Sequence, residues 1–456
     1  MKCRQLSVLK PQHRLDEKSL FVVAFNERLG ATSITRFKWS PDGPLPAARA
    51  HSLAKLRLIA FYLQQYFETV SVNPKIDTLR VTFVDGFCGG GSYNDRGQEV
   101  FGTPLLLLHL VEDAKRVLNE GRAKHIEINA DFHFVDSDKG AIDTLKAKLV
   151  SAGLLGRIDK DIHILRSSFA DAYSAIRAAI LARTRNMVGR SVFVLDQKGY
   201  KDAPLPLVRD ILSSFSGSEV ILTFAVGWLI DYLSDQPQTV RAVSQVGLTD
   251  EQIKEYLQLK ERKGGRIVIE RLLLRHLQDA TGAKFASPFF IRSEEANKDL
   301  WIVHLSNHMT ARDVMVEGHW KFKNHSLHFG TGGLEIMGFD PKQNPGDVPD
   351  FWFGDYEEAV MRDRLADDVL RRLRDSYQDG AARYLGFLAD VANETPARRS
   401  DFDSVAVALV GAKELRLSDL HGQLRRSTRP GKSDVISLNP QTSFHFMNRS
   451  SGQKIG

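Results

Sequence analysis

Cysteine is scarce in this chain, and long apolar runs are missing. Only Cys3 and Cys88 occur among 456 residues, too few for a disulfide framework or for a zinc or iron–sulfur site held by cysteines. No stretch of 18 uncharged apolar residues is present, which argues against a membrane-spanning helix. The first 18 residues lack the apolar core of a signal peptide. We therefore expect a cytoplasmic protein that does not associate with a membrane.

Two common nucleotide-binding signatures are absent from the most informative segment, the Asp-Gly-Phe-Cys-Gly-Gly-Gly of residues 85–91. It follows an apolar, β-branched run, so it predicts a buried strand that turns sharply at its carboxyl end. No Gly-Lys-Ser/Thr follows this turn, as a P-loop would require. A dinucleotide site would need a glycine at position 94, where Asn94 stands.

The remaining pattern, Asp-x-Phe-x-Gly-x-Gly, resembles motif I of class I S-adenosylmethionine methyltransferases. The resemblance implies that the backbone of the turn approaches the methionine end of the cofactor and that the acid holds its amino group. A tight strand-to-helix turn without a ligand is the alternative. The candidate cofactor-binding residues in this segment are Asp85, Gly86, Phe87, Gly89 and Gly91.

Strand and helix patterns alternate from residue 80 onward, which is typical of a parallel sheet. We predict an α/β fold of the Rossmann-like, class I methyltransferase type, with a mostly parallel sheet and an antiparallel hairpin at one edge. The predicted strands are 80–85, 131–136, 162–165, 191–196 and 219–224, then the hairpin 288–292 and 301–305. The predicted helices are 47–70, 104–121, 139–152, 171–183 and 204–215, with Thr103 as the cap of the second one.

A chain of this length predicts two or three domains. We expect an N-terminal cover segment with a long helix (1–75), a Rossmann-like domain (76–325) with a helical insertion (234–266), and an irregular and helical connector (326–395). Residues 396–456 predict an α+β domain of the winged-helix type, with helices at 402–411 and 418–426 and strands at 435–438 and 443–446. This last region holds ten Lys/Arg against five Asp/Glu, a surplus that suits DNA or RNA but also occurs in proteins that bind neither.

The ends of the second and third predicted strands also carry candidate cofactor contacts. Asp136, at the end of the second strand, is placed to accept the ribose hydroxyls of an adenosine, or alternatively to cap the following helix. Ser168 and Phe169 stand at the end of the third strand, where this class of methyltransferase contacts the adenine. A phenyl ring can stack on the base there, but Phe169 as an ordinary core residue is an equal alternative.

The fourth predicted strand ends in Leu-Asp-Gln-Lys-Gly-Tyr. In amino-methylating enzymes, this position carries an acid or amide that orients the acceptor amine and an aromatic that stacks on the flipped base. Asp196 and Tyr200 are therefore the candidate catalytic residues, with an ordinary strand-end cap as the alternative role of Asp196. His304 and His308 fall on a strand end and a turn rather than on one helix face, so we predict no metal site.

Taken together, these motifs are similar to the three-Cys-motif partner proteins over about residues 35–325. The resemblance implies a bacterial, methyltransferase-like protein that acts with a separate protein bearing clustered cysteines. One departure is Asp-Gln-Lys-Gly-Tyr, where members of the family usually have Asp-Pro-Phe-Gly-Tyr. The segments that carry the resemblance are 85–91, 101–105, 195–200, 205–212, 306–308 and 311–315, with His51 and Lys55.

Three functional hypotheses follow. The first is an S-adenosylmethionine-dependent methyltransferase acting on nucleic acid, with the basic C-terminal region recruiting the substrate. The second is an inactive adaptor that kept the fold and lost the reaction, which the Gln197-Lys198 departure motivates. The third is a DNA-binding regulator that works through the C-terminal domain.

Overall fold

The computed structural model describes residues 38–440, apart from 74–75, 123, 185–187, 198–199, 201, 234–245, 263–264, 294–297, 323–326, 330–349 and 353–354. Most of the predicted N-terminal cover segment and the predicted strand at 443–446 lie outside these residues. Among the described residues, no helix combines the length and apolarity that crossing a membrane requires.

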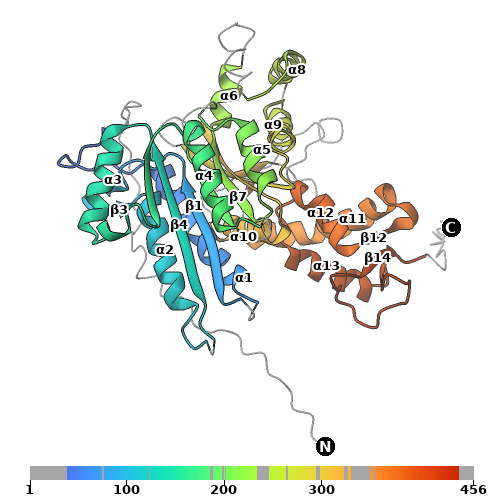
Figure 1. Cartoon of the computed structure of the whole chain (residues 1–456). Coiled ribbons are helices and arrows are strands. Elements are labelled where there is room, and N and C mark those ends of the chain that lie inside the picture. Colours follow the sequence, from blue (N-terminus) through green and yellow to red (C-terminus); the bar gives the residue numbers. More distant parts are fainter. Residues whose placement is uncertain are drawn as a thin grey trace, which may run out of the picture. The chain divides into compact units, whose positions relative to one another are not determined.

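A seven-stranded sheet forms the centre of the protein, in the order β5-β4-β1-β6-β7-β9-β8 (Figure 1). The first five strands in this order run parallel, and β9 and β8 form an antiparallel hairpin that joins the sheet through β7. The predicted α/β, mostly parallel methyltransferase-like fold with an antiparallel edge hairpin is thereby confirmed. The strands are β1 (Thr78–Asp85), β4 (Glu127–Asp136), β5 (Ile162–Arg166), β6 (Ser191–Leu195), β7 (Ser218–Phe224), β8 (Phe285–Ser293) and β9 (Lys298–Ser306).

Helices cover both faces of this sheet, which explains why its central strands read as continuous apolar runs. One face packs against α1 (Ala50–Val70), α2 (Thr103–Val117), α3 (Lys139–Ser151) and α10 (Met309–Lys321). The other packs against α4 (Phe169–Arg183), α5 (Leu205–Ser214), α6 (Val226–Tyr232), α8 (Asp250–Lys260) and α9 (Gly265–Thr281). Phe83 in β1 and Phe193 in β6 are completely buried. The carboxyl ends of the parallel strands are thus held in register by a core on each side.

The structure adds one element that was not predicted and corrects two local predictions. The polar segment after the glycine turn forms a hairpin, β2 (Ser92–Asp95) and β3 (Gln98–Phe101). Its two-residue turn, Arg96-Gly97, has positive φ at both positions, as a type I′ hairpin requires. Thr103 does not cap α2, because Gly102 occupies the N-cap position. The helical insertion runs past residue 266 to Thr281, since the apolar side chains of α9 belong to the core.

The C-terminal part has a hydrophobic core of its own. It contains α11 (Asp355–Ser376), β12 (Ala381–Arg383), α12 (Tyr384–Val391), α13 (Arg399–Gly411), β13 (Leu415–Ser418) and β14 (Val435–Leu438). The strands form an antiparallel sheet in the order β12-β14-β13. The helix predicted at 418–426 is wrong, because β13 ends at Ser418 and a backbone bridge joins Ser418 to Leu424.

This core also includes α11, which lies before the boundary predicted at residue 396, because this helix is amphipathic. Its acidic and basic residues hide a buried stripe of Met361, Leu365, Val369 and Leu373, spaced at four residues. This stripe packs with α12, α13 and β14 in one cluster, which also includes Trp320 of α10. A short antiparallel pair, β10 (Leu327–Phe329) and β11 (Asp350–Trp352), precedes α11.

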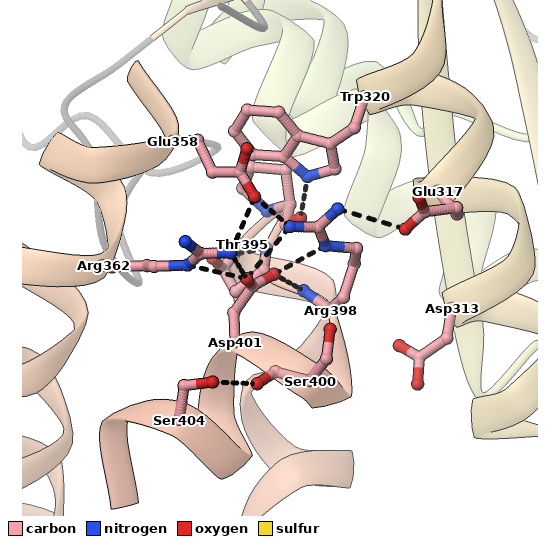
Figure 2. A network of polar contacts seen from close by, with 12 residues as sticks. Asp313, Glu317, Trp320, Glu358, Arg362, Thr395, Arg398, Ser400, Asp401 and Ser404 are labelled. Atoms are coloured by element: carbon pink, nitrogen blue, oxygen red, sulfur yellow. Dashed lines mark hydrogen bonds and ion pairs between the residues drawn. The ribbon is translucent and has the colours of Figure 1, made fainter. Parts of the chain in front are cut away.

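A buried polar network ties α10, α11 and α13 together, as Figure 2 shows. Asp401 is completely buried and accepts hydrogen bonds from the Arg398 Nε at 2.8 Å and the Arg362 Nε at 3.0 Å. Arg398 also pairs with Glu317 of α10 and Glu358 of α11. Burial opposes ionisation of Asp401, but the hydrogen bonds from Arg398 and Arg362 outweigh it and hold its pKa below the usual value.

Asp401→Ala should destabilise the C-terminal core by about 1.5–3 kcal/mol, because Arg398 and Arg362 lose hydrogen bonds to a buried carboxylate while they keep their contacts to Glu358. Since the folded pKa is lowered, this contribution is present at neutral pH and is lost as pH falls below about 4, through the folded pKa. Chemical denaturation followed by circular dichroism measures the change. Asp363→Ala, at an exposed position of α11, is the control and should change stability by less than about 0.5 kcal/mol.

Candidate functional site

The glycine turn after β1 is anchored by backbone hydrogen bonds to both neighbouring strands. The Gly86 amide donates to the Val194 carbonyl of β6, and the Cys88 amide donates to the Val135 carbonyl of β4. Gly89 and Gly91 have φ values of 59° and 86°, which side chains other than glycine adopt only with strain. The turn therefore presents bare backbone at the carboxyl edge of the sheet, where α/β proteins bind ligands.

Asp85, the last residue of β1, is buried beneath this turn and accepts a hydrogen bond from the Phe87 amide at 3.1 Å. The pKa of Asp85 is raised from its usual 3.8 to about 7, chiefly by burial and to a lesser extent by the nearby Asp196 and Asp136 carboxylates. The Phe87 amide and the Lys55 ammonium act in the opposite direction. Asp85 is thus a carboxyl group that a positively charged ligand would drive into its ionised form.

Asp136 faces the same turn from the end of β4. Its Oδ2 accepts from the Gly89 amide at 3.0 Å, and its Oδ1 accepts from the Asp138 amide at 2.8 Å. Each carboxylate oxygen retains a second lone pair, so ribose hydroxyls could still be accepted here. The helix cap is Asp138, which accepts from the Ala141 amide. Asp136 therefore shapes the turn rather than capping α3.

Two aromatic residues that sequence reasoning missed lie on the glycine turn. A Cβ atom placed on Gly90 would meet the Trp39 ring at 2.2 Å, so glycine at this position gives the indole its room. Trp39 also packs edge-on against Tyr93, with the ring centroids 5.3 Å apart. The Tyr93 hydroxyl has its pKa raised by burial and by Asp196, Asp85 and other nearby acidic groups. No motif marks either residue, because each comes from an irregular segment or a short hairpin.

The fourth strand-end acid, Asp196, binds a lysine that comes from α1. Lys55 is buried and forms an ion pair with the Asp196 Oδ2, while the Thr223 hydroxyl donates to the Oδ1 at 2.7 Å. Burial opposes ionisation of Asp196, but Lys55, followed by Thr223 and His51, lowers its pKa below the usual value. The Asp196 side chain remains 37% exposed. It is therefore an ionised acceptor that a ligand can reach.

The neighbours of Asp196 face the protein interior. The Tyr200 hydroxyl donates to the Ala225 carbonyl at 2.7 Å, and its ring packs on Phe224. Gln197 is buried and accepts from the Ala203 amide at 3.1 Å. Lys198 lies outside the described residues. The structure thus brings Asp196 to the glycine turn, whereas the Tyr200 ring contacts the Phe224 side of the core.

Ser168 caps the N-terminus of α4, and Phe169 at its start is a buried core residue. The Ser168 hydroxyl accepts from the Asp171 amide at 3.2 Å as the helix N-cap. Phe169 is 1% exposed and packs among Phe87, Tyr173 and Phe193. This placement favours the interpretation of Phe169 as a core residue over that of an adenine contact.

The two histidines weighed as metal ligands have different partners. The His304 Nε2 lies 3.2 Å from the Glu219 Oε2, and Tyr62 also donates to this carboxylate. The His308 Nε2 lies 2.7 Å from the Ser216 carbonyl. The cysteine of the turn, Cys88, is buried, and burial raises the pKa of its thiol well above the usual value. These groups do not add a nucleophile or a metal to the site.

No protein-family model matches the chain, and no curated protein matches it. Solved structures that match the chain include methyltransferases and a precorrin 8W decarboxylase. The bifunctional kinase–methyltransferase WbdD is 13% identical, over 56% of this chain and 39% of its own, with a TM-score of 0.29. An rRNA methylase from Streptococcus thermophilus is 10% identical over 54% and 93%, with a TM-score of 0.24. The plantazolicin methyltransferase BamL, solved with S-adenosylhomocysteine, is 12% identical over 57% and 87%, with a TM-score of 0.23.

This chain thus spans about two-fifths of the length of WbdD. Structural similarities with such low TM-scores do not strengthen the fold assignment, which rests on the strand order. The function has to be argued from the residues of the site. The similarity to three-Cys-motif partner proteins stays a prediction.

Asp85→Asn should stabilise the protein at neutral pH and lower the affinity of the glycine turn for a positively charged ligand. The folded pKa of about 7 lies above the usual 3.8, so the wild type loses stability as pH rises from about 4 to about 7, whereas the variant does not. The melting temperature of the variant should therefore rise relative to the wild type between pH 5 and 8, by an amount that corresponds to about 1 kcal/mol or more. A difference independent of pH would contradict the raised pKa. Asp367→Asn, at an exposed position of α11, is the control.

Proposed function

We propose that the protein binds S-adenosylmethionine at the glycine turn and transfers its methyl group to an acceptor held at Asp196. The observation that carries this proposal is the set of three acids, Asp85, Asp136 and Asp196, from the ends of three adjacent parallel strands around one bare turn. Each of the other two carboxylates acts electrostatically on Asp85. The position of the acids at the carboxyl edge is the one that the fold reserves for ligands.

The charge of the site suits this cofactor. S-adenosylmethionine carries a sulfonium and an ammonium group, and three carboxylates with one lysine leave a negative surplus beside the turn. A cation next to Asp85 would stabilise its ionised form and offset the desolvation free energy that raises its pKa. Asp136 would hold the ribose through the lone pairs that its two amide contacts leave free. The bare backbone at Gly89 and Gly91 allows the methionine end to approach closely.

The chemistry asks little of the protein beyond alignment, because the sulfonium supplies an activated methyl group when the cofactor is bound. Asp196 is ionised and fixed by Lys55 and Thr223, which suits it to accept a hydrogen bond from an acceptor N–H. Its lowered pKa makes it a weak base, so the role is orientation of an amine rather than removal of a proton from a weak acid. An exocyclic amine of a nucleic-acid base fits this chemistry.

Calorimetric titration with S-adenosylhomocysteine should give one binding site, and Asp85→Asn should weaken it about tenfold or more, as expected for a lost hydrogen bond to a charged group. Because Trp39 lies on the turn, binding should also change tryptophan fluorescence, and Trp39→Phe should remove most of this change while retaining binding. Absence of binding at millimolar ligand would end the cofactor proposal.

Asp196→Asn should reduce methyl transfer about 100-fold or more, since a lost transition-state contact to a charged group is worth a few kcal/mol. Its affinity for S-adenosylhomocysteine should change less than threefold. Radiolabel transfer to total DNA, tRNA and rRNA measures the first quantity, and calorimetry measures the second. Undiminished turnover in the variant would contradict the role of Asp196.

We further propose that the C-terminal part recruits nucleic acid as a winged-helix module. Its three helices and three-stranded sheet surround one core. The loop between β13 and β14 carries exposed basic side chains. Arg425 and Arg429 lie 3.7 Å from Asp434 and 3.5 Å from Asp403, respectively, and both are exposed. The exposed cations of the loop are Arg425, Arg426, Arg429 and Lys432. Such a loop suits contacts to phosphates, which provide affinity without reading sequence.

The double variant Arg426→Glu and Lys432→Glu should weaken binding to duplex DNA or RNA and lower the slope of log affinity against log salt by about two, one for each lost phosphate contact. Fluorescence anisotropy at several salt concentrations measures both quantities. Lys254→Glu, an exposed position on α8, is the matched control and should leave the slope unchanged. An unchanged slope in the double variant would place any nucleic-acid contact elsewhere.

A second candidate function is that of an inactive adaptor for a protein with clustered cysteines. One observation favours it: both oxygens of Asp196 already have partners, and the Tyr200 hydroxyl is bound to the Ala225 carbonyl. An adaptor would form a stable complex with the cysteine-cluster protein and would transfer no methyl group to DNA, tRNA or rRNA. Radiolabel transfer by the purified complex decides between the two candidates.

A further inference from the structure

A cluster of two histidines and one aspartate lies away from the glycine turn and plays no part in the proposed reaction. Asp131 and His133 are on β4, and His163 is the register partner of His133 on β5. Since residues i and i+2 of a strand share one face, the three side chains converge on the same side of the sheet. Asp131 stands five residues before Asp136, roughly 15 Å along the strand, so the cluster is separate from the methyl-transfer site.

The three side chains already contact one another through the atoms that bind metals. The His133 Nε2 lies 3.0 Å from the Asp131 Oδ2, and the His163 Nε2 lies 3.3 Å from the Asp131 Oδ1. One ligand atom from each residue falls within 4.8 Å of the others. Ligands at about 2.1 Å from a tetrahedral zinc ion are roughly 3.4 Å apart, so the spacing needs little adjustment.

Burial gives the cluster a defined geometry with access from one side. Asp131 and His133 are 3% and 4% exposed, while His163 is about one-third exposed at its side chain and offers a path of entry. A metal ion at this position would bind the carboxylate of Asp131 and the neutral form of both imidazoles.

Two features of the cluster set conditions on binding. The imidazole rings of His133 and His163 are stacked, with centroids 4.7 Å apart, so both must rotate about the soft χ2 torsion to direct their lone pairs at one ion. Arg183 lies 3.7 Å from the Asp131 Oδ1 and also donates to Asn129. The hydrogen bonds to Asn129 hold the guanidinium beside the same Asp131 oxygen that His163 contacts, where it could act as an outer partner that orients this ligand.

We propose that Asp131, His133 and His163 form a binding site for a divalent transition metal such as zinc, with solvent completing the coordination. The set of two imidazoles and one carboxylate suits zinc and its neighbours in the first transition row rather than magnesium or calcium. The proposal is independent of the proposed function. An ion here would join β4 to the edge strand β5, so its effect is on the stability of that edge.

The test uses full-length protein that carries no affinity tag and has been freed of metal with a chelator. One sample is titrated with zinc in competition with a chromophoric chelator, and another is titrated with cobalt and followed by visible absorption. We expect one equivalent of zinc bound at micromolar concentration or tighter, an absorption band typical of tetrahedral cobalt, and a higher melting temperature with zinc. His163→Ala should weaken zinc binding at least tenfold, in line with the loss of one ligand.

His109→Ala is the matched control, because His109 also lies 3.3 Å from a carboxylate, that of Asp113, on the surface of α2. This variant should bind zinc as the wild type does. Two results would overturn the proposal: no zinc binding by the wild type at about 100 μM zinc, or unchanged zinc binding by His163→Ala. Because the wild-type titration needs no variant and His163 is partly exposed, misfolding of a variant does not obscure the outcome.

Discussion

The ion pair between Lys55 and Asp196 is the interaction on which the arrangement of the site depends. Three acids gather at the carboxyl ends of β1, β4 and β6, and their mutual repulsion would favour protonation of at least one of them. The Lys55 ammonium lets Asp196 stay ionised, while burial, with a smaller contribution from Asp196 and Asp136, raises the pKa of Asp85. The same ion pair links α1 to the carboxyl end of β6. Electrostatics and packing are thus coupled at one contact.

Much of the sheet could be predicted from sequence because its strands are buried on both faces. Apolar, β-branched runs such as Val81–Val84 have few alternatives, and the order of strands and helices restricts the topology strongly. The place of Asp85, Asp136 and Asp196 at one edge of the sheet could be predicted for the same reason, because each ends such a run and parallel strands end at one edge. The observed strand boundaries differ from the predicted ones by only a few residues.

The rest of the site could not be predicted because it depends on contacts between distant segments. Trp39 reaches the turn from an irregular segment, and Lys55 was noted only for its family resemblance, without its partner. Phe169 follows a strand end as an adenine contact would, yet packing decides that it faces the core. In the C-terminal part, the charge of α11 concealed its buried stripe, and Ser418 lies in a strand because it pairs with β14.

The ion pair of Lys55 with Asp196 also has a consequence for how the chain acquires its structure during synthesis. The two residues are 141 positions apart, so Lys55 leaves the ribosome long before its partner exists. At roughly 5–20 residues per second, about 7 to 28 seconds separate the synthesis of Lys55 from that of Asp196. The ion pair can therefore form only after β6 has been made. The apolar face of α1 has partners that emerge earlier, in β1, α2 and β4, so packing of this helix can precede its electrostatic contact.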